Sequence, residues 1–100
     1  MRYRIKRRPK YKIAQFYQNV MRKYRHTYSV DLMHKNIDDA FASMFLIEQS
    51  LLRRRPTLAR WQQEGWHMAA AGHWFYAYTV EGDTVIIQDA CHEQNMHESY

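Results

Sequence analysis

The chain of 100 residues is poor in several kinds of residue, and each shortage excludes a class of protein. It has a single cysteine, Cys91, which rules out an intrachain disulfide framework and fits a reducing compartment such as the cytoplasm. Three glycines and two prolines are too few for a collagenous or low-complexity chain. No apolar run approaches about 18 residues, so we expect no membrane span. The basic N-terminus lacks the apolar segment of a secretory signal.

The same shortages limit the chemistry of the chain. The glycines, Gly65, Gly72 and Gly82, form no phosphate-binding loop, which disfavours enzymes that use a nucleotide cofactor. Candidate metal ligands occur after position 88, but a second cysteine and a His-x₃-His pair are both missing. We therefore expect neither a metal nor a cofactor.

What the chain does contain is enough for one folded domain spanning residues 1–100. Apolar residues make up 46% of it and 15% are aromatic, which argues against disorder. A chain of this length buries roughly two-thirds of its unfolded surface.

Charge is distributed unevenly along the chain. Residues 1–50 hold 11 basic and 4 acidic side chains, whereas residues 51–100 hold 4 basic and 6 acidic ones. The first 25 residues include ten Lys or Arg and no acid, with aromatic residues between the cations. Such asymmetry is typical of a face that meets a polyanion or an acidic protein partner, and a mixture of cations and aromatics suits RNA. A solvated basic surface without a partner is the alternative.

The apolar spacing predicts two helices in the first half. Ile13, Phe16, Tyr17, Val20 and Tyr24 belong to one helical stripe that follows Pro9. A second stripe extends from about Asp31 to Arg54, with Ser29 or Asp31 as its cap and Pro56 as its stop. Its members, expected to be largely buried, include Met33, Ile37, Phe41, Met44 and Leu51. The short link between the stripes predicts an antiparallel helical hairpin.

Strand patterns flank these helices. Residues 3–5 alternate apolar and charged side chains, and residues 66–69, 73–80 and 84–87 predict three further strands. Glu81-Gly82-Asp83 predicts a tight hairpin turn, and residues 57–65 are expected to be a connection. The predicted fold is α+β, in the order β-α-α-β-β-β, with an N-terminal strand and a helical hairpin packed on an antiparallel sheet.

This order, size and charge resemble the RelE/ParE superfamily of toxins from bacterial type II toxin–antitoxin systems. The motif resemblance covers about the last third of the chain. Members have a Trp at the start of the second strand, a Tyr-x-Val before the hairpin turn and an apolar last strand. The matching residues are Trp66, Tyr78, Val80, Gly82, Asp83 and Val85 to Ile87.

The resemblance implies a toxin that inhibits translation as a ribosome-dependent mRNA endoribonuclease, or mRNA interferase, and that an antitoxin protein neutralises. The family's ribonucleases place arginines on the second and third strands, and here Ala69 and Phe75 occupy those positions. The alternative is therefore a non-cleaving toxin or interaction protein on the same fold, which inhibits gyrase as the ParE branch does or binds nucleic acid.

Metal-independent RNA cleavage needs proton transfer and cations, and histidine is the natural acid or base. His92 follows the last strand, where the family carries catalytic side chains, and His67 and His73 lie on neighbouring strands. We predict that these three imidazoles share one concave surface. The predicted phosphate-binding residues are the nearest cations in the sequence, Arg53, Arg54, Arg55 and Arg60.

Overall fold

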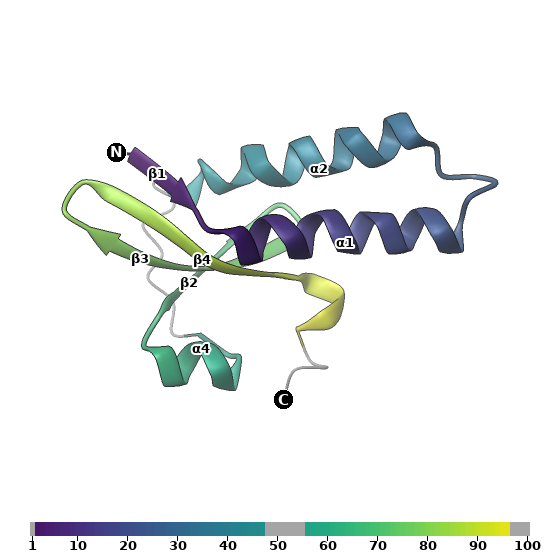
Figure 1. Cartoon of the computed structure of the whole chain (residues 1–100). Helices are drawn as coiled ribbons and strands as arrows, with labels where there is room; N and C mark the ends of the chain where they lie inside the picture. Colours follow the sequence, from purple (N-terminus) through teal and green to yellow (C-terminus); the bar gives the residue numbers. More distant parts are fainter. Residues whose placement is uncertain (1, 48–55, 97–100) are drawn as a thin grey trace.

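A computed structural model of the chain describes residues 2–47 and 56–96 (Figure 1). The predicted strands and the helical hairpin are present, and the described residues between the hairpin and the second strand, 56–66, include a short helix that was not predicted. The elements in chain order are β1 (Arg2–Ile5), α1 (Arg7–Lys23), α2 (Val30–Met44), α4 (Ala59–Glu64), β2 (His67–Ala71), β3 (Trp74–Glu81), β4 (Thr84–His92) and the 3₁₀ helix η1 (Glu93–Asn95).

The four strands form one sheet in the order β1-β4-β3-β2. The predicted antiparallel meander of the last three strands is confirmed, and Gly82 turns the β3–β4 hairpin with φ of 60°. The sheet as a whole is mixed rather than antiparallel, because β1 runs parallel to β4, with Arg2 opposite Thr84 and Ile5 opposite Ile87. Parallel neighbours need a long crossover instead of a hairpin, and both helices of the hairpin lie in that crossover.

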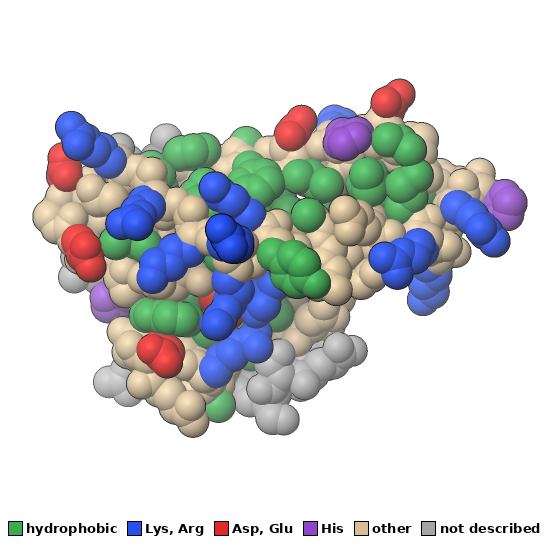
Figure 2. Space-filling model, viewed as in Figure 1, with side chains coloured by type: hydrophobic (Ala, Val, Ile, Leu, Met, Phe, Trp, Pro, Cys, Tyr) green, Lys and Arg blue, Asp and Glu red, His purple; other side chains and the backbone are tan. Residues whose placement is uncertain are grey.

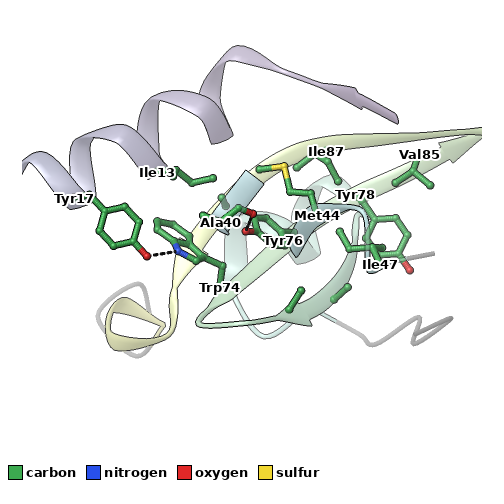
Figure 3. Close-up of a cluster of buried hydrophobic side chains, with 13 residues drawn as sticks. Ile13, Tyr17, Ala40, Met44, Ile47, Trp74, Tyr76, Tyr78, Val85 and Ile87 are labelled. Carbon is green, nitrogen blue, oxygen red and sulfur yellow. Dashed lines mark hydrogen bonds between the residues drawn. The ribbon is translucent and has the colours of Figure 1, made fainter. Parts of the chain in front are cut away.

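The helical hairpin covers one face of the sheet (Figure 1). Of the two predicted caps, Ser29 is the one that caps α2, since its Oγ accepts a hydrogen bond from the Leu32 amide at 3.1 Å. Buried side chains of both helices pack against the aromatic residues of β3, and Trp74 Nε1 donates to the Tyr17 hydroxyl at 3.1 Å (Figure 3). Ile13 and Met44 are fully buried in this core.

Helix α2 ends at Met44, earlier than the predicted Arg54. The carbonyl of Ala40 accepts from Ser43 Oγ at 2.6 Å and from the Tyr76 hydroxyl at 2.8 Å. These bonds compete with the helical backbone at its last turn, where Phe45 and Leu46 already bond only three residues back. Within the predicted stripe Met44 is buried, whereas Met33, Ile37 and Phe41 are only partly buried against the core. Leu51 lies outside the described residues.

A second, smaller apolar cluster lies on the opposite face of the sheet, where α4 packs (Figure 1). Helix α4 replaces the connection predicted for residues 57–65, and fully buried Trp61 anchors it. Gly65 ends it in the left-handed conformation, with φ of 70°. The cluster comprises Leu58, Trp61, Met68, Ala77 and Cys91, with Trp66, Phe75 and Met96 at its margin.

Candidate functional site

Two of the predicted histidines are brought together at one end of the sheet. His92 ends β4, and His73 lies just before β3, whose first residue Trp74 is opposite His92 in the sheet. The two imidazole ring centroids are 6.2 Å apart and the ring planes differ by 24°. The two rings therefore lie close together as predicted, but His92 is buried and lines the groove described below, whereas His73 is exposed and lies outside its lining.

His67 does not belong to this pair. It is opposite Tyr78, and its ring packs against that tyrosine with a centroid distance of 5.5 Å. Tyr78 lies four positions after Trp74 along β3, a span of about 13 Å. Because β2 runs antiparallel to β3, the first residue of β2 lies far from the start of β3. The prediction that His67 lies beside His73 and His92 is therefore wrong.

Of the four predicted arginines, only Arg60 lies within the described residues. Arg60 lies on α4, and its side chain is 48% exposed. Arg53, Arg54 and Arg55 lie outside the described residues, so the structure does not test their predicted role.

A groove of about 370 Å³ opens beside His92, between α1, α4 and the C-terminal end of β4. Its lining combines two cations, three carboxamides and aromatic side chains. The residues are Lys12, Gln15, Phe16, Asn19, Arg60, Trp74, Ala90, Cys91, His92 and Asn95. Of these, only His92 and Arg60 were predicted as site residues.

A buried carboxylate holds both cations of the groove. Asp89 is fully buried, and its Oδ1 lies 2.7 Å from Lys12 Nζ while its Oδ2 lies 3.5 Å from Arg60 Nε. Trp61 Nε1 donates to the same Oδ2 at 2.8 Å, and the Ala90 amide donates to Oδ1 at 2.8 Å. Asp89 thus connects α1, α4 and β4 at the groove. The signal in the sequence is a lone acid in a strand whose other residues are uncharged or histidine and mostly apolar.

His92 is almost fully buried beside the groove, with 7% of its surface exposed. Its ring stacks on Phe16 at a centroid distance of 4.0 Å, and Trp74 meets it edge-on. Burial lowers the pKa of His92, and neighbouring Glu93 opposes that effect only in part. The Gln94 amide donates to Nδ1 at 3.2 Å, and since an amide N–H can only donate, Nδ1 accepts. His92 is therefore a neutral imidazole with its proton on Nε2.

His73 has the opposite environment. Its side chain is 76% exposed, and its Nδ1 lies 2.9 Å from Glu93 Oε1. A carboxylate only accepts hydrogen bonds, so Nδ1 carries a proton and, in the neutral ring, Nε2 has the free lone pair. The Glu93 amide also donates to the His73 carbonyl at 2.9 Å, which ties η1 to this position. Of the two imidazoles, His73 is the one equipped to accept a proton.

The cations come from one part of the chain. All 15 Lys and Arg lie at positions 2–60, so β2, β3 and β4 contain none. Ala69 is fully buried under the helices and Phe75 packs toward α4, so neither position supplies a charge. Figure 2 shows Lys and Arg gathered over the start of α1 and from there toward α4. The positive charge at the groove is supplied by helices rather than by strands.

Comparisons with known proteins do not assign the chain to a family. No family model matches it, and no curated protein matches it either. Across residues 2–47 and 56–96, no helix has the length and apolar character needed to cross a membrane. In that same part of the chain, no three His, Cys, Asp or Glu side chains are grouped as a metal site would need.

Proposed function

We propose that the protein is a toxin of the RelE/ParE type that binds RNA in this groove and cleaves it, so that translation stops. The observation that supports this most directly is that His92 lines the groove together with Lys12 and Arg60, and that His73, outside the lining, has its ring centroid 6.2 Å from that of His92. The described elements also keep the order that the resemblance implies, apart from the added α4. The proposed substrate is messenger RNA on the ribosome, and an acidic antitoxin would cover the cations of the groove.

The cations account for binding. Lys12 and Arg60 line the groove, and Arg7, Arg8 and Lys10 are exposed on the first turn of α1 nearby. Arginine binds phosphate oxygens through paired N–H groups, and lysine binds them as a point charge. An RNA strand that passes along α1 therefore meets positive charge both before and within the groove.

The imidazoles account for cleavage, with different tasks. His73 Nε2 accepts the proton of a ribose 2′-OH, and Glu93 holds the ring in the tautomer that this requires. The 2′-oxygen attacks the adjacent phosphorus, and the 5′-oxygen leaves with a proton from water. His92 donates Nε2–H to a phosphate oxygen and stays neutral. The expected products are a 2′,3′-cyclic phosphate and a 5′-hydroxyl. This assigns proton transfer to His73, where the sequence favoured His92.

A non-cleaving protein on the same fold is the second candidate, and one observation favours it. Strands β2 and β3 provide no cation where the family's ribonucleases have arginines, since Ala69 and Phe75 stand there. Such a protein would bind nucleic acid or block gyrase without breaking a bond.

A cell-free translation extract separates the two candidates. Purified protein is added to the extract, and the integrity of the message is followed by primer extension. Cleavage predicts new message ends and loss of synthesis, and His73→Ala should lower the cleavage rate by about 10²–10⁴-fold. His34→Ala is the matched control, because His34 is exposed on α2.

Each result has a distinct meaning. Inhibition with intact messages, unchanged in His73→Ala, would support the non-cleaving candidate and refute cleavage. Absence of inhibition together with absence of RNA binding would refute the RNA-directed toxin as a whole. A DNA supercoiling assay then tests gyrase directly.

A further inference from the structure

The groove contains side chains that phosphate binding and proton transfer do not use. Gln15 and Asn19 on α1 and Asn95 in η1 place three carboxamides along its lining. Gln15 and Asn19 are four residues apart, so they lie on the same face of the helix as Lys12 and Phe16. This largely polar face of α1 lines the groove.

Carboxamides match the edges of nucleobases. Each one presents a donor and an acceptor side by side, which allows a paired hydrogen bond to a base edge, and adenine is the base that Asn and Gln pair with most readily. Phe16 lines the same groove, is partly exposed and offers apolar surface against which a base can stack, whereas Trp74 is only 3% exposed.

The net charge and the volume of the groove indicate how many nucleotides it can bind. Lys12 and Arg60 carry two positive charges and Asp89 one negative charge, so the cluster has a net charge of +1. That matches one phosphodiester. Arg60 faces Asp89 through Nε, and its guanidinium has two further nitrogens for a phosphate. A volume of about 370 Å³ lies in the range of small-ligand pockets and is far too small for a duplex.

We propose that the groove binds one unpaired nucleotide of single-stranded RNA and identifies its base. The phosphate lies against Lys12 and Arg60, and the base lies among Gln15, Asn19 and Asn95, with adenine preferred. The inference rests on the proposed function, because it names the substrate unit of the same groove. The major groove of an RNA duplex is too deep and narrow for side chains to reach the base edges, so the nucleotide must be unpaired.

Binding of short RNAs to the full chain tests this without cleavage. Four fluorescent pentamers, UUAUU, UUCUU, UUGUU and UUUUU, carry 2′-O-methyl groups so that no 2′-OH can attack. Fluorescence anisotropy at one fixed salt concentration gives each Kd. The pentamer with central adenine is expected to bind about tenfold more tightly than the weakest of the others, and a duplex of the same length should bind more weakly than all of them.

Variants show which side chains read the base. Gln15→Ala and Asn19→Ala should each reduce the preference between the pentamers, whereas Arg60→Gln should weaken all four alike. Gln18→Ala is the matched control, since Gln18 is exposed on α1 outside the groove lining. Equal affinity for the four pentamers, equal affinity for the duplex, or an effect of Gln18→Ala as large as that of Gln15→Ala would overturn the inference.

The results also separate this inference from the proposed function. Base-selective binding by a protein that leaves translation intact would keep the nucleotide site and refute the toxin. Message cleavage by a protein that binds all four pentamers equally would keep the toxin and refute the base-reading site. Failure to bind any pentamer would refute the nucleotide site, and the translation extract would still decide the toxin.

Discussion

Replacing Asp89 by Asn tests whether the groove is organised by a buried carboxylate. All four groups around Asp89 are donors: Lys12 and the Ala90 amide at Oδ1, and Trp61 and Arg60 at Oδ2. Both oxygens must therefore accept hydrogen bonds. The amide of Asn has the same shape but only one acceptor, so its NH₂ group has to face donors whichever way it turns.

The size of the effect follows from the burial of the partners. Trp61 is fully buried, and loss of an acceptor for its N–H costs about 1–3 kcal/mol. Lys12 and Arg60 are partly exposed, with side-chain exposures of 28% and 48%, so they rehydrate and add no more than about 1 kcal/mol. The expected loss is about 1–4 kcal/mol, a large share of the roughly 5–15 kcal/mol of a small domain.

Urea unfolding followed by tryptophan fluorescence measures this loss. At a slope of about 1.5 kcal/mol per molar, the midpoint of Asp89→Asn should fall by about 1–3 M. Asp38→Asn is the control, because Asp38 is exposed on α2 and its replacement should change stability by less than about 0.5 kcal/mol. A midpoint for Asp89→Asn within the range of the control would refute the described role of the carboxylate.

Three further predictions concern stability and binding. Because the pKa of His92 is lowered in the folded chain, the unfolded chain takes up a proton at this residue first as pH falls below about 6.5, and the stability of the fold should drop there. His92→Asn keeps an acceptor for the Gln94 amide but does not titrate. Its urea midpoint should therefore fall less between pH 8 and pH 5 than that of the unaltered protein. Tyr76→Phe removes a buried hydroxyl bonded to Ala40 and Ser43 and should cost about 1–2 kcal/mol in thermal or urea unfolding, and an unchanged midpoint would contradict the hydrogen bonding described. Arg60→Gln should reduce the slope of log Kd for single-stranded RNA against log salt by about 0.7, and an unchanged slope would remove Arg60 from the phosphate contacts.

The sequence predicted those elements whose signal lies entirely within their own residues. The stripe that includes Ile13 and Tyr17, the cap at Ser29 and the turn at Gly82 are local signals, and each appears as predicted. Helix α4 was missed because six residues with one buried anchor, Trp61, show no recurring stripe. The parallel pairing of β1 was missed because neither strand's pattern records the direction of its neighbour.

The site was predicted only in part, because only some of its contacts follow from the order of neighbouring elements. His73 and His92 come together because the order of hairpin-linked strands already places the start of β3 beside the end of β4. His67 was misplaced because its distance depends on register, which puts it opposite Tyr78. The role of Asp89 depends on Lys12 and Arg60, which are far from it in sequence, and only the folded chain brings these charges together.

The most direct test of the proposed ribonuclease is the chemistry of the RNA ends it leaves. Ribosome-bound messenger RNA is incubated with the purified protein, and the fragments are analysed for their terminal groups. We predict 2′,3′-cyclic phosphate and 5′-hydroxyl ends with the unaltered protein and with His34→Ala, and a rate about 10²–10⁴-fold lower with His73→Ala. Uncleaved RNA with every protein, or cleavage by His73→Ala at the full rate, would contradict the mechanism.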